Sequence, residues 1–342
     1  MHLRLLDDSD DSQLIDFLDR ISAETGIGLA YHSPFYRDAL VRVGVGSPLY
    51  TGAFKGDTLI GVLPGFIKTT DNGTVYNSLP FFGPNAGVQC LPENNDCHAP
   101  LFSFLMEHLR SEYDMLSAAV YSPFLADTDE HYTQLQADIV VDKFTHYIDM
   151  ENHTLPGVRR RDINTARKRD VTIIDNPSRD ELAEVFEIYK TNCTDYGIEL
   201  KPWPLFEYFL ENYDSDNLLV SAAVHDGTII AGLITLYSKG VASYYIPCQK
   251  HETRSLQPVP FLIDHHMDRV KEAGVRYWNW ESSPSLDSGV AFFKKKWNSI
   301  EGHYKIHVIP FRTQSDFSKL GVETIQRDYP WFFVYPFDRL SD

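Results

Sequence analysis

A run of positive charge is the stretch of this sequence best suited to bind an anionic ligand. It spans Arg159–Arg169, where six of eleven residues are basic, in a chain with a formal charge of −17. If the run is helical, Arg160, Asn164 and Arg167 share one face. Guanidinium groups on that face can hold a phosphate or a carboxylate. A solvated basic face that balances local acidity is the alternative interpretation.

The cysteines and histidines show no spacing typical of a metal site. Of the four cysteines, only Cys90 and Cys97 are close in sequence, as a C-x6-C pair. This is neither a zinc-finger spacing nor a disulfide framework. His265 and His266 lie on a predicted helix, where one of them can be a core residue, and their spacing does not support metal ligation. We therefore expect reduced cysteines, no metal and a cytoplasmic location.

Several broad classes of function do not fit the sequence. It contains no G-x-S-x-G, Walker or G-x-G-x-x-G pattern, which argues against hydrolases, kinases and dehydrogenases. Its net acidity disfavours a broad surface for duplex DNA. No apolar run approaches the ~20 residues of a membrane span, and the first residues lack the apolar core of a signal peptide. We expect neither duplex DNA binding nor integral membrane association.

Hydrophobic patterning predicts a similar succession of elements in both halves of the chain. In the first half we expect helices at 10–22 and after 33–34, a strand hairpin at 49–54 and 58–67, a strand at 74–79, a helix at 100–111 and a strand at 114–121. In the second half we expect the basic helix, helices at 179–196 and 204–212, a hairpin at 218–224 and 228–237, a strand at 241–246, a helix at 258–273, a strand at 275–280, a short helix containing Lys294 and a last strand at 300–310.

The repeated order indicates an α/β protein with mixed sheets, built from two copies of one design. We expect a first domain at 1–150 and a second at 151–342, both of ordinary size. The tail after Phe311 is apolar around Tyr329–Phe333, so we expect it to pack as part of the second domain.

The order of elements resembles the GNAT acyltransferase fold, and its duplication resembles the tandem FemAB-like family. Two motifs carry the likeness. The run R-R-R-D-I-N-T-A-R-K (159–168) is similar to the family's R-x-x-I-x-x-A-x-K, and G-V-A-F-F-K-K-K-W-N (289–298) is similar to its G-L-x-x-F-K-x-x-F-G. Trp297 and Asn298 replace the family's Phe and Gly. The resemblance covers most of the chain up to about Pro310 and implies two tandem GNAT-like domains.

The resemblance also implies acyl transfer to an amine, which needs a polarised carbonyl, a neutral amine and a stabilised leaving group. It places Lys294, the lysine of the F-K motif, near the transferred group or the donor phosphate, where its charge would stabilise a developing anion. Glu281 ends a predicted strand and can act as the base for an ammonium, with Asp287 as a weaker alternative. Tyr245 lies where a GNAT strand would open and can act as an acid or hydrogen-bond donor.

Each of these three catalytic candidates also has a structural interpretation. Lys294 can belong to a solvated run of lysines, Glu281 can be a capping residue and Tyr245 can be a packed strand aromatic. Phe293, beside Lys294 in the F-K motif, is a candidate for contacting the substrate.

The implied acceptor is an amine of a cell-envelope precursor, such as an amino sugar, a nucleotide-linked or lipid-linked sugar, or a peptide. Arg160, Asn164 and Arg167 are the candidates for binding its phosphate or carboxylate. Arg159 and Lys168 take this role if the helical phase is shifted by one residue.

The donor site departs from that of acetyl-CoA-binding GNAT domains. Those carry R/Q-x-x-G-x-G/A after the central strand, where backbone N–H groups cradle the pyrophosphate. Here residues 250–258 read K-H-E-T-R-S-L-Q-P, without glycine, although Arg254 can still contact a phosphate. FemAB-like aminoacyltransferases use aminoacyl-tRNA, so the resemblance allows acyl-CoA or aminoacyl-tRNA as donor. The absence of a broad basic surface favours the CoA thioester.

We therefore predict an N-acyltransferase or aminoacyltransferase. The alternative is a non-catalytic GNAT-like module, with a decayed donor site, that binds a nucleotide-sugar or a protein partner. The missing glycines favour the module, whereas the F-K motif and the basic helix favour the enzyme.

Overall fold

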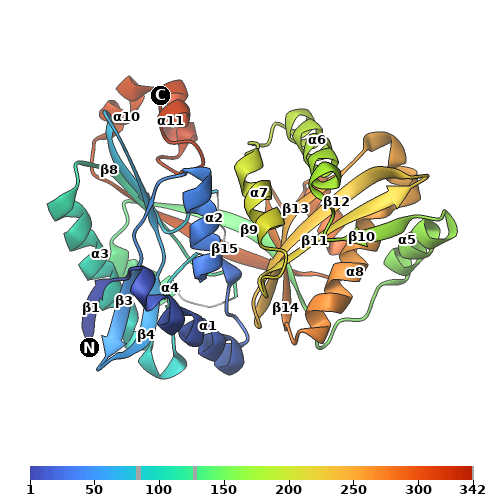
Figure 1. Ribbon diagram of the computed structural model, residues 1–342. Coiled ribbons are helices and arrows are strands. Elements are labelled where there is room, and N and C mark those ends of the chain that lie inside the picture. Colours follow the sequence, from blue (N-terminus) through green and yellow to red (C-terminus); the bar gives the residue numbers. More distant parts are fainter. Residues whose placement is uncertain (82–85, 126–128, 341–342) are drawn as a thin grey trace. The chain divides into compact units, whose positions relative to one another are not determined.

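The computed structural model describes residues 1–81, 86–125 and 129–340 (Figure 1). The chain divides into two compact units: the first contains Met1–Thr25, Tyr31–Lys143 and His303–Asp342, and the second contains Gly26–Ala30 and Phe144–Gly302. This division differs from the expected 1–150 and 151–342, most of all at the tail. Residues 303–342 belong to the first unit because β15 (Ile300–Pro310) pairs with β8 (Met115–Tyr121) there.

A sheet with one parallel pair forms the centre of the second unit. Its strands lie in the order β10 (Thr172–Asp175), β11 (Leu218–His225), β12 (Thr228–Tyr237), β13 (Val241–Gln249), β14 (Tyr277–Ser283) and β9 (Ile139–Asp149). Neighbours are antiparallel except β13 and β14. The β11–β12 hairpin turns at Asp226 and Gly227, with φ of 49° and 70°. Positive φ at both positions is the type I′ geometry that Asp-Gly favours.

Helices α6 (Arg179–Tyr196) and α8 (Pro258–Glu272) cover opposite faces of this sheet (Figure 1). A Cβ at Gly232 would meet Val185 of α6 at 2.3 Å, whereas its neighbours on β12 belong to the core cluster that includes α8 residues. Successive strand residues point to opposite faces, so the two helices lie on different sides. The predicted basic helix is α5 (Gly157–Lys168), which packs on α8, while α7 (Trp203–Glu211) packs on α6 and α9 (Gly289–Lys295) on β14.

His266 of α8 is the core histidine that the sequence allowed. It is fully buried, and its Nδ1 and Nε2 lie 2.8 Å from Thr235 Oγ1 and Ser221 Oγ. Ser221 donates to Asp175, so it accepts from His266 Nε2–H, and Thr235 donates to Nδ1. Burial lowers the pKa of His266 to about 3. His265, in contrast, forms an ion pair with Asp175 at 2.9 Å.

The first unit has two sheets. One contains β1 (His2–Leu5), β3 (Thr51–Lys55), β4 (Thr58–Leu63) and β7 (Gln89–Cys90), all antiparallel. The other contains β15, β8, β6 (Gly73–Asn77), β5 (Phe66–Thr70) and β2 (Ser47–Pro48), with β6 and β8 parallel. The helices are α1 (Asp11–Thr25), α2 (Pro34–Val43), α3 (His98–Glu112), α4 (Asp129–Tyr132), α10 (Gln314–Leu320) and α11 (Val322–Asp328).

The C-terminal tail is packed, as its apolar composition predicted. Phe317, Ile325 and Tyr329 are buried in the first unit, and the Tyr329 hydroxyl donates to Gly73 O at 2.9 Å. None of the helices in the described ranges is both long and apolar enough to cross a lipid bilayer.

Cys90 and Cys97 are joined by a disulfide, so the expectation of reduced cysteines is wrong for this pair. The chain turns back between β7 and the 3-10 helix Pro92–Cys97, which brings the two side chains together. Sequence spacing alone does not reveal such a turn. Cys193 and Cys248 of the second unit are buried and free.

The buried state of His266 predicts an acid-sensitive second unit. Its folded pKa of about 3 lies below the ordinary 6.5, so the unfolded chain takes up this proton first as the pH falls. Stability is therefore lost between pH 6.5 and 3, by at most about 1.4 kcal/mol per pH unit. We expect His266→Gln to show a shallower pH dependence than the parent in urea unfolding followed by tryptophan fluorescence. Equal slopes for the two proteins would contradict this assignment.

Candidate functional site

The parallel strands of the second unit separate partway along their length. Pairing between β13 and β14 covers only Val241–Ser243 against Tyr277–Asn279. No later pair joins the two strands among the described residues, although β13 continues to Gln249 and β14 to Ser283. An extended ligand can add to this side of β13 as it would to a sheet edge.

Both strands carry extra residues where they separate. Tyr245 is the extra residue of β13 against β12, within the segment where the sequence predicted that the strand would open. In β14, Trp280 and Glu281 lie opposite the single residue His146 of β9. Glu281 has a φ of 61°, in the left-handed region that glutamate rarely adopts. Bulges re-aim side chains and are frequent beside active sites.

A buried polar network holds Glu281 in this unusual conformation. Its N–H donates to Asn279 Oδ1 at 3.1 Å, and its Oε1 accepts from Asn279 Nδ2 at 3.0 Å. Its carbonyl accepts from Thr145 Oγ1 at 2.8 Å. Asn279 and Thr145 are fully buried, so neither partner can move freely. The carboxylate therefore has a defined position, which a general base requires.

Lys294 is a buried cation that supports the same segment. Its Nζ donates to the carbonyls of Glu281 and Ser282, at 2.8 and 2.7 Å, and to Ser283 Oγ at 3.0 Å. These bonds use all three N–H groups of the ammonium. Burial lowers the pKa of Lys294 to about 7, and the charge of Glu281 opposes the shift.

This geometry makes Lys294 a positioning residue, because its donors are spent within the protein. Its side chain is only 2% exposed, so the alternative of a solvated lysine run is wrong for Lys294. That alternative does describe its neighbours, since Lys295 and Lys296 are exposed.

Lys201, which the sequence did not single out, adds a second cation beside Glu281. It lies half-buried in the connection between α6 and α7, with Nζ 5.1 Å from the ring centroid of Tyr245. Burial lowers the pKa of Lys201, and the negative charge of Glu281 is the main opposing influence. The structure thus brings Glu281, Lys294 and Tyr245 into one region with Lys201. A lysine before Pro202 in the connection 197–202 carries no motif that could have revealed this.

His146 is a second residue that sequence reasoning missed. It is fully buried opposite the β14 bulge, and neither ring nitrogen has a hydrogen-bond partner in the described part of the chain. Burial lowers its pKa, and the positive charge of Lys294 adds to the shift. A neutral imidazole here has one donor and one acceptor nitrogen, and both are buried.

The predicted anion-binding face of α5 is at the surface. Arg160, Asn164 and Arg167 are all exposed. Arg167 forms an ion pair with Asp264 at 3.4 Å and lies over the ring of Phe261, 5.5 Å from its centroid. This face is accessible to a phosphate or carboxylate, and its role in binding stays a prediction.

Arg159, the alternative residue on α5, is part of the core instead. It is 4% exposed, and its Nη2 donates to the carbonyl of Phe293 at 2.9 Å. Its guanidinium lies 4.5 Å from the ring centroid of Phe293 and 5.2 Å from that of Trp297. Arg159 therefore links the basic motif to the F-K motif, and Phe293 contributes to this contact.

The predicted donor residue Arg254 lies apart from this network. It is exposed on the 3-10 helix His251–Leu256 and contacts the hydroxyl of Tyr196. The next helix, α8, begins with Pro258 and also contains Pro260 in its first turn. Proline has no amide hydrogen, so this helix N-terminus offers few donors to a pyrophosphate.

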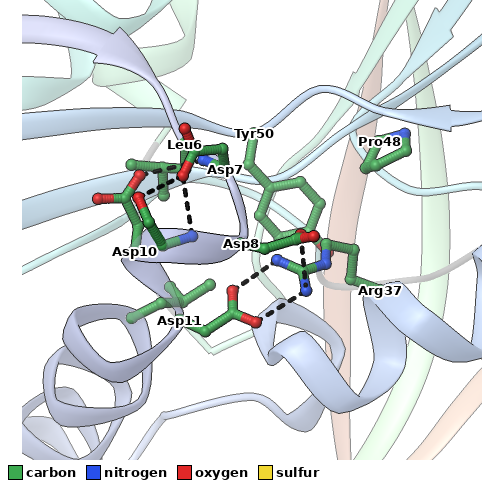
Figure 2. A pocket seen from close by; sticks show the side chains of 10 residues that line it. Leu6, Asp7, Asp8, Asp10, Asp11, Arg37, Pro48 and Tyr50 are labelled. Carbon is green, nitrogen blue, oxygen red and sulfur yellow. Dashed lines mark hydrogen bonds and ion pairs between the residues drawn. The ribbon is translucent and has the colours of Figure 1, made fainter.

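The first unit contains a cavity of about 450 Å³, and none of the predicted site residues lines it (Figure 2). Its cation is Arg37, whose Nη1 and Nη2 donate to the Asp11 carboxylate at 2.6 and 2.9 Å. Nε of Arg37 donates to Asp38 at 2.9 Å, and Asp8 lies 3.3 Å away. Because carboxylates saturate this guanidinium, the cavity is a poor match for an anionic donor.

In the first unit, the parallel strands β6 and β8 do not separate as β13 and β14 do. β6 remains paired with β8 as far as its last residue, Asn77, which lies opposite Ala119. The second unit is therefore the better candidate for a site formed by separating strands.

Comparison with known proteins bears on the family and the fold. Residues 157–280 match the family model of the acetyltransferase (GNAT) domain. No match was found among curated protein sequences. The crystal structure of FemX is similar, with 10% identity, 89% of this chain and 97% of that chain covered, and a TM-score of 0.66.

Two further structures share the fold. The C-terminal domain of a putative lysylphosphatidylglycerol synthetase from Agrobacterium fabrum has 14% identity, covers 93% of this chain and 96% of its own, and gives a TM-score of 0.58. A tandem GNAT protein from the clavulanic acid biosynthesis pathway has 12% identity and a TM-score of 0.51, and the match covers 89% of this chain and 97% of that chain.

The second unit is thus a GNAT domain, in which a sheet opens at a parallel pair beside bulged strands. The chain as a whole shares its fold with FemX and with a tandem GNAT protein, as its motifs indicated.

The bonds of Lys294 predict that its removal destabilises the second unit. Lys294→Met keeps the apolar stem but leaves two carbonyls and a hydroxyl without their donor, and we expect a loss of about 3 kcal/mol. The control is Lys296→Met, an exposed neighbour, for which we expect less than about 0.5 kcal/mol. Urea unfolding followed by tryptophan fluorescence measures both. Equal small effects would show that the three bonds contribute little.

Proposed function

We propose that the second unit catalyses transfer of an acyl or aminoacyl group to the amine of an acceptor. The observation that carries this proposal is the position of Glu281. Glu281 lies on a strained bulge of β14, where β13 and β14 separate, and its charge acts on Lys201. Its backbone carbonyl accepts a hydrogen bond from Lys294. A strained, fully supported residue of this kind is typical of functional sites.

The residues have distinct roles in the proposed reaction. Glu281 takes a proton from the acceptor ammonium, and the neutral amine attacks the acyl carbonyl. The new C–N bond forms as the bond to the donor thiol or ribose oxygen breaks. The nitrogen then loses a second proton, which passes to that leaving group, and Glu281 releases the first proton to solvent. Lys201 supplies positive charge to the oxyanion, and Tyr245 at the β13 bulge borders the acyl group. Lys294 positions Glu281.

The residues around the start of α8 favour a donor whose binding does not require backbone N–H groups to hold a pyrophosphate. Two prolines reduce the amides at the helix start. The residues that precede α8 border a cavity of about 540 Å³. Four carboxylates line it, those of Asp180, Glu184, Glu187 and Glu252, against one lysine, Lys250, and the imidazole of His251. These carboxylates repel a CoA pyrophosphate. The structure therefore shifts our preference from a CoA thioester to an aminoacyl ester, the donor that the FemAB-like resemblance allows.

The proposed acceptor is an amine of a cell-envelope component, such as an amino sugar, a nucleotide-linked or lipid-linked sugar, or a peptide. Support comes from the fold shared with FemX and with a lysylphosphatidylglycerol synthetase domain. The exposed basic face of α5 is suited to a phosphate of such an acceptor or of tRNA.

Donor binding tests this preference. We expect acetyl-, succinyl- and longer acyl-CoAs to leave the melting temperature unchanged, and a pool of aminoacyl-tRNA carrying radiolabelled amino acids to be retained on filters with the protein. A CoA ligand at ~100 times its dissociation constant would instead add ~2.7 kcal/mol, a shift of a few degrees. Such a shift would overturn the aminoacyl preference. Failure of both donors would support the non-catalytic module.

Glu281 provides the test of the reaction itself. With a working donor and a panel of amines, we expect Glu281→Gln to lower kcat/KM by at least about 100-fold, since a general base contributes that much. Glu281→Gly should be equally inactive but should unfold at no lower urea concentration than the parent, because glycine adopts positive φ without strain. The control is Glu272→Gln, an exposed carboxylate on α8. Full activity of both Glu281 variants would rule out the proposed base.

A further inference from the structure

Two cysteines and a histidine converge in the first unit, on elements that contribute nothing to the site proposed above. Cys90 lies on β7, Cys97 ends the 3-10 helix Pro92–Cys97, and His98 begins α3. One potential ligand atom from each residue lies within 4.8 Å of the other two. The sulfur atoms are bonded to each other in this structure, and the histidine is adjacent to them.

Strand β4 leaves room for both sulfur atoms. Gly61 pairs with Cys90 across the sheet. A Cβ at Gly61 would lie 2.5 Å from Cys97 Sγ and 3.1 Å from Cys90 Sγ, too close for any side chain. Cys97 is fully buried and His98 is 4% exposed. The absence of a side chain at Gly61 thus leaves room for the two sulfur atoms.

The distance between His98 and Cys90 suits a shared metal ion. His98 Nδ1 lies 3.7 Å from Cys90 Sγ. In a tetrahedral zinc site, bonds of about 2.3 Å to sulfur and about 2.0 Å to nitrogen hold these two atoms about 3.6 Å apart. Two thiolates on one zinc ion lie about 3.8 Å apart, so the sulfurs need only side-chain rotation once they are released from each other.

A second imidazole lies beside His98. His131 of α4 stacks on His98, with ring centroids 4.4 Å apart and planes inclined by 12°. The imidazole of His131 is therefore a further potential nitrogen ligand, next to the two sulfur atoms and the His98 nitrogen that already converge.

We propose that the first unit, when its disulfide is reduced, binds one zinc ion through Cys90 Sγ, Cys97 Sγ and His98 Nδ1. The fourth position is open to His131 or water. A dithiol supplies two electrons and two protons, which convert the disulfide to two thiols. Zinc then displaces both protons, and the dication with two thiolates forms a centre without net charge. In the disulfide-bonded protein, His98 Nδ1 donates to the Asn95 carbonyl at 2.9 Å. Ligation therefore breaks this bond and moves the imidazole proton to Nε2.

The role of this centre is structural. β7 has only two residues, paired with β4 at Gly61 and Val62, and a strand this short holds itself in place weakly. Bonds from one ion to β7, to the following 3-10 helix and to α3 fix all three segments against the sheet. The disulfide joins the first two of these segments in the oxidised protein.

Metal binding to the reduced full-length chain tests the proposal. After reduction and anaerobic desalting, titration with Co²⁺ should give thiolate-to-cobalt charge-transfer absorption at one equivalent per chain, and Zn²⁺ should displace it. We expect Cys90→Ser and Cys97→Ser each to abolish the absorption, and His98→Gln to weaken binding at least about 10-fold. The control is Cys193→Ser, a free buried cysteine of the second unit, which should bind normally.

The same titration gives results that would overturn the proposal. One is a reduced, folded protein that binds neither ion, which would leave the pair as a disulfide alone. Another is binding that persists in both Cys90→Ser and Cys97→Ser. Circular dichroism shows whether each variant is folded, and the measurement needs no transferase substrate, so it is independent of the function proposed for the second unit.

Discussion

One buried ammonium group sets the geometry on which the candidate site depends. Taking the Lys294 ammonium out of water costs several kcal/mol. Three charge-assisted bonds, each worth about 1.5–3 kcal/mol, offset that cost only while all their acceptors stay in place. Residues 281–283 are therefore held in a single conformation. The net gain in stability is modest, and the main consequence is that the backbone at Glu281 cannot relax.

This constraint explains why a glutamate can persist at a φ of 61°. Such a conformation costs of order 1–3 kcal/mol and survives only where its surroundings over-determine it. Here Asn279 and Thr145 hold the residue from β14 and β9, while Lys294 holds it from α9. Three elements thus converge on one carboxylate. Strain of this kind has no structural benefit for a capping residue, which supports a chemical role for Glu281.

Local chemical rules account for what the sequence predicted correctly. The Asp-Gly turn of the β11–β12 hairpin and the helix at α5 follow from neighbouring residues. Lys201 and the Cys90–Cys97 bond could not be predicted in this way, because they depend on where connections run after folding. The tail was expected in the second domain for the same reason, since the pairing of β15 with β8 joins distant parts of the chain.

The two units show how one fold can be used differently at the same place. In the first unit, the end of the parallel pair is occupied by the chain itself. Asn77, the last residue of β6, donates to the carbonyl of Phe333 at 2.9 Å and accepts from its N–H at 2.7 Å. In the second unit, the strands separate after Ser243, and no segment pairs with this side of β13 in the described ranges. The tail backbone, which is hydrogen-bonded to the Asn77 side chain, thus takes the place of a bound extended ligand. The tail therefore occupies, in the first unit, the position that stays unpaired in the second, which supports the proposal that the second unit carries the site.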